Sequence, residues 1–184
     1  GNAIWFEDAA EKMGVDVMRW LYASQNPEHN LLFGYSIADE VRKNLITLWN
    51  TYYFFVTYAN LDNFSPQSVD VDDSDYAILD NWISSKMNEF INESKSHYEK
   101  FEVYKLMKNA SLILDNLSNW YVRRNRRRFW KSESDNDKNA AYLTLYNALI
   151  TYVKVLAPII PFLSEEIYKN LSGSESSIHL SSFP

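Results

Sequence analysis

The stretch VRKNLITLWNTYYFFVTYANL, residues Val41–Leu61, decides the fold class of this chain. Its apolar residues recur at spacings of 4, 3, 4, 3 and 4, which places one continuous stripe on a single face of a helix. These residues are Val41, Leu45, Leu48, Tyr52, Phe55 and Ala59. Partner helices have to bury such a stripe, so the stretch predicts a long bundle helix that begins near residue 36. Ser36-Ile37-Ala38-Asp39 has the form of a capping box, and we expect Ser36 to cap this helix.

The remaining sequence repeats the helical period. No strand-like alternation persists between turn signals, and only four Gly and five Pro interrupt the chain. The further helices that we expect lie at residues 6–12, 15–24, 76–96, 102–127, 140–156 and 161–171. The predicted fold class is therefore all-α, a helical bundle.

The helix expected at 102–127 leads into the stretch SNWYVRRNRRRFW, Ser118–Trp130. Its apolar stripe consists of Val103, Leu106, Ala110, Ile113, Leu117 and Trp120 or Tyr121. Residues Arg123–Lys131 hold five Arg, one Lys and no acid, a charge of +6; since the whole chain carries −6, the other residues sum to −12. This asymmetry suggests a local anion site on an otherwise acidic surface.

Two interpretations of the arginine cluster are open. Cations near a helix C-terminus gain about 0.3–1 kcal/mol from the helix dipole and can pair with acids elsewhere, so the cluster can be purely structural. Alternatively, arginine suits bidentate contact with phosphate and stacking on bases. Aromatic residues interleave with the arginines, as in sites for single-stranded nucleic acid.

The residues that we assign to nucleic-acid binding are Arg123, Arg124, Arg126, Arg127, Arg128, Trp130, Lys131 and Asn50. Arg124 falls closest to the apolar stripe, so we expect it to be partly structural and paired with a buried acid. Arg126, Arg127 and Arg128 are expected to be more exposed. Replacing Arg127 and Arg128 with Ala should then weaken RNA binding and leave the melting temperature nearly unchanged.

The aromatic residues beside the arginines, and Asn50 in the stretch 41–61, differ in the role that we expect of them. Trp120 and Tyr121 lie on the stripe and are assigned mostly to packing, whereas Phe129 and Trp130 follow it and suit either role. Trp130 is the candidate surface for stacking a splayed base. Asn50, a polar residue in the otherwise apolar stretch LWNTYYFF, either contacts the nucleic acid or bonds a neighbouring helix.

Composition excludes several classes of protein. The 184 residues, 46% of them hydrophobic, fit one domain, with or without a small appendage. The chain has no Cys, which excludes disulfides and thiolate ligands, and its three His share no metal-binding spacing, so we expect no metal site. The DVDDSD run lacks the Gly and Glu of a calcium loop. No apolar run reaches the ~18 residues of a membrane span.

No signal peptide opens the chain, which begins at Gly1, and we expect it to be a piece of a longer protein.

The stretch LDNLSNWYVRRNRRRFW resembles isoleucyl-tRNA synthetase, a family of class I aminoacyl-tRNA synthetases. GVDVMRWLYAS looks like the helix that carries the family's Asp-Ala-Leu-Arg motif, here Asp16-Val17-Met18-Arg19. LWNTYYFFVTYANLD looks like the first long bundle helix, and LAPIIPFLSEEIY and SIHLSSFP like the last helix and its tail. Gly1-Asn2 resembles the Gly-Asn after the Lys-Met-Ser-Lys-Ser loop. Valyl- and leucyl-tRNA synthetases share the bundle, and the arginine-rich continuation favours the isoleucyl family.

This resemblance implies an anticodon-binding domain of the class I synthetase type. Residues 1–35 would be a helical lead-in after the catalytic domain, residues 36–172 the anticodon-binding bundle and residues 173–184 an extended tail. The implied partners are tRNA(Ile) and the enzyme's own catalytic domain, with no DNA and no membrane, in a cytoplasmic monomer. The parent enzyme would join isoleucine to tRNA(Ile) using ATP with Mg²⁺. The catalytic motifs and the editing domain are absent from this sequence, so we expect this piece to have no catalytic residue, no cofactor and no activity alone.

Two other classes of function compete with this one. The chain can be a protein-interaction scaffold whose arginines dock an acidic partner, or an isolated domain that binds DNA or another polyanion. The net charge of −6 argues against duplex binding, because most of the surface would repel DNA. Preference for the tRNA(Ile) anticodon stem-loop over duplex DNA would separate these functions.

Overall fold

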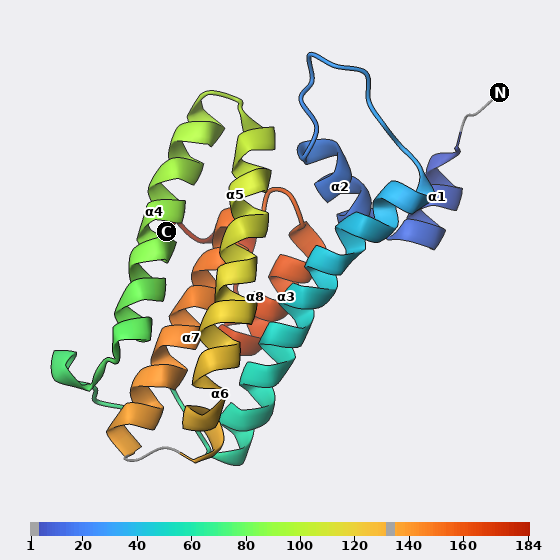
Figure 1. Cartoon of the computed structure of the whole chain (residues 1–184). Helices are drawn as coiled ribbons and strands as arrows, with labels where there is room; N and C mark the ends of the chain where they lie inside the picture. Colours follow the sequence, from blue (N-terminus) through green and yellow to red (C-terminus); the bar gives the residue numbers. More distant parts are fainter. Residues whose placement is uncertain (1–3, 132–134) are drawn as a thin grey trace.

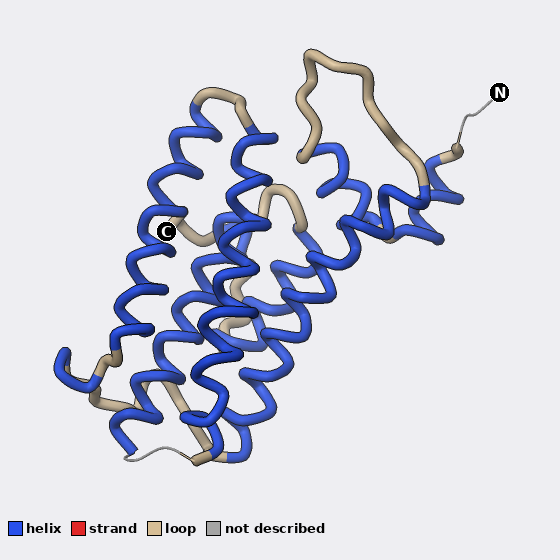
Figure 2. Tube along the Cα trace, in the orientation of Figure 1, coloured by secondary structure: helices blue, strands red, loops and turns tan. Residues whose placement is uncertain are grey.

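A computed structural model describes residues 4–131 and 135–184, and Gly1-Asn2 lies outside them. The described residues contain helices and no strand, which confirms the all-α prediction (Figures 1 and 2). The α-helices are α1 (Phe6–Met13), α2 (Val15–Ala23), α3 (Tyr35–Leu61), α4 (Ile78–Glu99), α5 (Val103–Asp115), α6 (Arg123–Trp130), α7 (Asp135–Leu156) and α8 (Pro161–Ser172). A π-helical segment, η2 (Asn116–Val122), joins α5 to α6, and 3-10 turns form η1 (Asp73–Asp75) and η3 (Ile178–Leu180).

The bundle is built around α7. Helix α7 packs against α3, α4, α6 and α8, while α5 lies beside α4 (Figure 1). Buried residues occur around much of α7, as expected of a helix enclosed by others. They are Ala140, Ala141, Tyr142, Thr144, Leu145, Ala148, Leu149, Tyr152, Val153, Val155 and Leu156. Helices α1 and α2 lie at the N-terminal end of α3, away from α6 (Figure 1).

Helix α3 has the buried stripe that the sequence predicts. Leu45, Leu48, Tyr52, Phe55 and Ala59 are buried, and Val41 is half-buried. The predicted cap at Ser36 is wrong, because α3 begins at Tyr35, after Gly34, without a side-chain cap. The earlier start places Ser36 inside the first helical turn. Helix α4 also begins later than predicted, at Ile78.

The Asp16-Val17-Met18-Arg19 motif connects α2 to the turn between α7 and α8. Helix α8 has Ile160 before it, which provides no capping side chain. Asp16 replaces the missing cap: its carboxylate accepts from the N–H groups of Leu163 at 2.7 Å and Phe162 at 3.5 Å. Arg19 donates to the carbonyls of Pro158 at 2.7 Å and Ile159 at 2.9 Å. The motif therefore supplies hydrogen bonds that the turn cannot make by itself.

We expect Asp16→Ala to destabilise the chain by about 0.5–2 kcal/mol, the usual cost of losing a helix cap. Thermal unfolding followed by circular dichroism measures the change. Glu11→Ala on neighbouring α1 is the matched control, because Glu11 is exposed and makes no ion pair with a described residue. Equal melting temperatures for the two variants would contradict a capping role.

The C-terminal tail returns to α8. Glu165 accepts from the backbone N–H of Ile178 at 2.8 Å and from the hydroxyl of Ser177 at 3.0 Å. Ile178 is buried, and the tail is non-helical except for the turn η3. The tail is thus attached to α8 by hydrogen bonds to Glu165, and its Ile178 side chain extends the hydrophobic core beside that helix.

Candidate nucleic-acid interface

The arginine cluster lies at the end of a helix whose register changes before it. In a π-helix, hydrogen bonds run from i to i+5, so each turn takes up more residues than in an α-helix. After Leu117, the buried positions are therefore Tyr121, Val122, Asn125 and Phe129. The assignment of Tyr121 to packing is confirmed. The assignment of Trp120 is wrong, since its side chain is 48% exposed.

The register change decides which arginine is structural. Arg128, with its side chain 14% exposed, meets Asp80, which is fully buried at the start of α4. Arg128 Nη1 donates to Asp80 Oδ1 at 2.8 Å, and Nη2 donates to Oδ2 at 2.9 Å. A second ion pair joins Arg128 to Asp137 of α7 at 2.8 Å. The pairing with a buried acid that we expected for Arg124 therefore belongs to Arg128, and the expected exposure of Arg128 is wrong.

The other partners of Asp80 complete a buried network. The hydroxyl of Tyr121 donates to Asp80 Oδ1 at 2.6 Å, and the N–H of Ala77 donates to Oδ2 at 2.8 Å. Burial raises the pKa of Tyr121, and the neighbouring Asp80 carboxylate raises it further. Burial alone would lower the pKa of Arg128, but its hydrogen bonds to Asp80 and Asp137 raise it. The guanidinium of Arg128 thus stays charged and is neutralised inside the fold.

The other four arginines remain on the surface. Arg123, Arg124, Arg126 and Arg127 are exposed, and none forms an ion pair within residues 4–131 and 135–184. This confirms the exposure predicted for Arg126 and Arg127 and corrects the structural role expected of Arg124. Lys131 is likewise exposed. Five exposed cations, four along α6 and one directly after it, therefore have no acidic partner among the described residues, and they are available to an external anion.

Two of these arginines rest on aromatic rings. The guanidinium of Arg124 lies 4.5 Å from the ring centroid of Trp120, and that of Arg126 lies 5.6 Å from the centroid of Phe54 on α3. Such contacts orient a guanidinium while leaving its N–H groups free to donate. Phe54 is itself fixed by an edge-to-face contact with the buried ring of Phe129, at 5.2 Å between centroids.

The predicted side chains beside the arginines are accessible. Trp130 is 62% exposed, whereas Phe129 is fully buried, so the two ambiguous aromatics have opposite environments. Asn50 is exposed on α3, and its side chain makes no hydrogen bond to another described residue. The alternative that Asn50 merely bonds a neighbouring helix is therefore wrong for the described chain. Binding of RNA by these residues stays a prediction.

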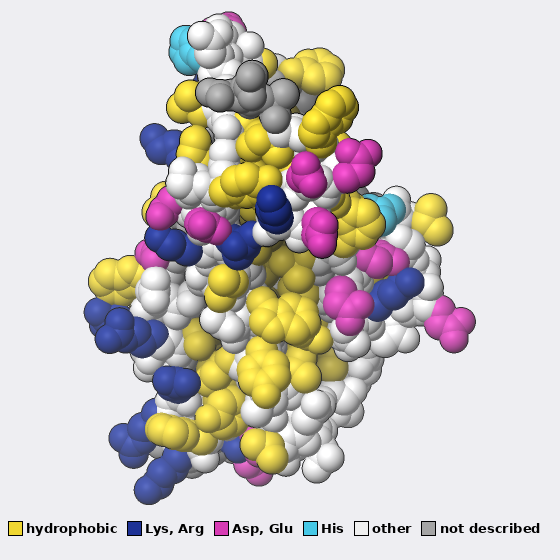
Figure 3. Space-filling model, turned by 90° about the vertical axis from the view of Figure 1, so that its right-hand side faces the viewer, with side chains coloured by type: hydrophobic (Ala, Val, Ile, Leu, Met, Phe, Trp, Pro, Cys, Tyr) yellow, Lys and Arg dark blue, Asp and Glu magenta, His cyan; other side chains and the backbone are white. Residues whose placement is uncertain are grey.

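The surface around the cluster is grooved. One groove of about 230 Å³ lies between α3 and the η2–α6 segment, and its walls include Asn50, Phe54, Ser118, Val122, Arg123 and Arg126. Another of about 490 Å³ is lined by Asn119, Trp120, Arg123 and Arg124. Figure 3 shows Lys and Arg side chains gathered along one edge of the molecule, next to exposed hydrophobic side chains. Sequence periodicity did not single out Ser118 or Phe54, because neither forms part of an apolar stripe or a charge run.

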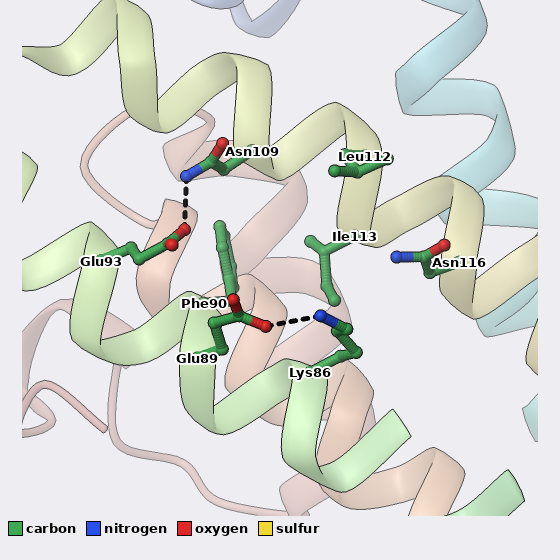
Figure 4. Close-up of a pocket in the computed structure, with 8 residues that line it drawn as sticks. All are labelled: Lys86, Glu89, Phe90, Glu93, Asn109, Leu112, Ile113 and Asn116. Atoms are coloured by element: carbon green, nitrogen blue, oxygen red, sulfur yellow. Dashed lines mark hydrogen bonds and ion pairs between the residues drawn. The ribbon is translucent and has the colours of Figure 1, made fainter. Parts of the chain in front are cut away.

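A further pocket, of about 180 Å³, lies between α4 and α5 (Figure 4). Four of its polar side chains already bind one another in pairs: Lys86 donates to Glu89 at 2.7 Å, and Asn109 donates to Glu93 at 2.6 Å. With two carboxylates and one ammonium, this pocket does not suit a phosphate or a base. The groove beside the arginines is the better candidate.

No group of three or more His, Asp or Glu among the described residues is placed to hold a metal ion. Within the same part of the chain, every helix is too short or too polar to cross a membrane.

Comparison with known proteins adds two findings. The model of a family described as the anticodon-binding domain of tRNA ligase matches residues 80–184, which include Asp80 and the arginine cluster. Relatives named isoleucine–tRNA ligase are 39% identical in Porphyromonas gingivalis, 41% in Dehalococcoides mccartyi and 42% in Bacteroides thetaiotaomicron, each alignment covering 100% of this chain. The alignments cover 16%, 19% and 16% of those relatives, so this chain spans less than a fifth of their length.

Proposed function

Because the chain belongs to the family of anticodon-binding domains of tRNA ligases, we propose that it binds the anticodon stem and loop of tRNA(Ile). The binding surface is the exposed part of the arginine cluster with Trp120, Trp130 and Asn50. The choice of isoleucine tRNA rests on the names of the relatives, which match over the whole chain.

One observation carries the assignment of the surface. Four arginines are exposed without acidic partners among residues 4–131 and 135–184, on a chain whose residues outside Arg123–Lys131 sum to −12. Unpaired cations of this kind repel one another, and a phosphate backbone relieves that repulsion while displacing counterions. Exposed tryptophans beside them offer flat surfaces to unstacked bases of a loop.

The activity of the longer protein belongs to the same proposal. The parent enzyme joins isoleucine to tRNA(Ile) with ATP and Mg²⁺, bound by parts outside this chain. This chain then positions the tRNA without catalysing a step, as a cytoplasmic monomer that contacts its own catalytic domain. Held by its anticodon arm, the tRNA presents its other end to that domain.

We expect the chain to bind a tRNA(Ile) anticodon stem-loop more tightly than the same stem with a scrambled loop. Fluorescence anisotropy titrations at 50 and 200 mM salt measure both affinities. An equal length of duplex DNA serves as the competitor, and a protein scaffold would show no preference between the nucleic acids. Binding that is absent even at 50 mM salt would refute the proposed function.

A further inference from the structure

We propose that the groove between α3 and η2–α6 is a pocket for one unstacked base of a single-stranded RNA loop. Asn50 and Ser118 would bind the edge of that base, and Arg123 and Arg126 would hold its flanking phosphates. This inference rests on the proposed function and makes it specific, because it assigns base discrimination to a defined set of side chains.

The shape of the groove suits one planar ring. Its volume of about 230 Å³ lies below the roughly 300–1,000 Å³ of pockets for drug-sized ligands. Phe54 and Val122 supply its apolar part, which is where the flat face of a base can lie. Phe54 is held by Phe129 at 5.2 Å and by Tyr58 at 4.8 Å, so the ring is fixed before any ligand arrives.

The polar groups of the groove come from two different helices. Asn50 belongs to α3 and Ser118 to η2, and neither side chain hydrogen bonds to another residue of the described chain. An amide offers two donors and one acceptor, and a hydroxyl offers one donor and two acceptors. Together they match the donors and acceptors along the edge of a nucleobase, whereas a phosphate would need donors alone.

The charges of the groove favour an anionic ligand over a cationic one. Arg123 and Arg126 are the charged residues of its lining, and both are exposed without an acidic partner among the described residues. Arg126 already lies over Phe54, with its guanidinium 5.6 Å from the ring centroid. An occupant with an aromatic ring and an adjoining anion fits these groups, and a nucleotide has both.

The π-helical segment gives the groove one of its walls. Ser118 lies between the buried residues Leu117 and Tyr121, on the wide turn of η2, and it is half-buried next to α3. Segments of π-helix occur frequently at functional sites, because the wider turn redirects side chains. Here the wide turn brings a free hydroxyl and Arg123 to the same groove.

The test is a set of anticodon stem-loops in which each loop base in turn is replaced by an abasic site. For the wild-type chain, we expect one abasic position to weaken binding about 5- to 100-fold, the usual value of a specific base contact. For the Asn50→Ala variant, the abasic site at that same loop position should weaken binding by less than about 2-fold, because the side chain that distinguishes the base is gone. Ser118→Ala should remove part of the same penalty.

Asn60→Ala is the matched control, since Asn60 is an exposed asparagine of α3 outside the groove. It should keep the full abasic penalty. If Asn50→Ala keeps that penalty too while salt-dependent binding persists, the base pocket is wrong and the proposed function stands. If the wild type binds no stem-loop, both proposals fail, and capture of an acidic protein instead would indicate the scaffold function. Melting temperatures of the variants confirm that they fold.

Discussion

Arg128→Ala should unfold this chain about 10 °C below the wild type. The substitution leaves the buried Asp80 carboxylate with two hydrogen-bond donors among the described residues, the hydroxyl of Tyr121 and the N–H of Ala77. Removing one member of a buried ion pair costs about 3–5 kcal/mol, because the remaining charge has no counterion. For a chain of this length, each kcal/mol corresponds to about 2–4 °C. Thermal denaturation followed by circular dichroism measures the shift.

Arg127→Ala is the matched control for this prediction. Arg127 is the preceding residue, has the same charge and is exposed, so its removal should change the melting temperature by less than about 2 °C. A double Ala variant of Arg127 and Arg128 should therefore melt about as low as Arg128→Ala, in contrast to the unchanged melting temperature expected from the sequence. Adding Asp80→Asn to Arg128→Ala should recover part of the loss, since the uncompensated charge disappears. Equal melting temperatures for the two single variants would show that the buried pair contributes nothing.

The second large effect concerns salt. If Arg123, Arg124, Arg126 and Arg127 each contact a phosphate, the logarithm of the binding constant falls with the logarithm of salt at a slope of about −3 to −3.6. Binding of the anticodon stem-loop then weakens about 100-fold between 50 and 200 mM salt. Replacing all four with Gln should remove nearly all of that change, because the slope is proportional to the number of phosphates that the protein neutralises. Anisotropy titrations over a series of salt concentrations give both slopes.

A control variant that loses four positive charges far from α6 distinguishes phosphate contacts made by the arginines from an effect of the net charge of the chain. Lys95, Lys100, Lys105 and Lys108 are exposed near the turn between α4 and α5, at the end of the bundle remote from α6 (Figure 1). Changing these four to Gln should preserve the slope. If both quadruple variants lose the slope equally, the charge acts at long range and the arginine cluster makes no specific phosphate contacts.

The position of the candidate interface was predictable, because the cationic cluster that marks it depends on residue type alone. Five arginines within six residues, with no acid among them, indicate an anion site on an acidic chain whichever way the helix faces. The identity of the structural arginine was not predictable from that run. Extending the apolar stripe at α-helical spacing selects Arg124, whereas the π-helical turn at Asn116–Val122 moves the buried face to Asn125 and Phe129 and brings Arg128 to Asp80.

The sequence by itself determined the all-α class, the buried face of α3 and the place of the cationic cluster, because each follows from local spacing or composition. Tertiary structure decided which side chains meet: Asp80 with Arg128 across 48 positions, and Asp16 with the start of α8 across 147. It also decided that Asn50 and Ser118 line one groove. Such pairings depend on how helices distant in sequence are positioned against one another. That position is set only when the side chains of all the helices pack together in the core.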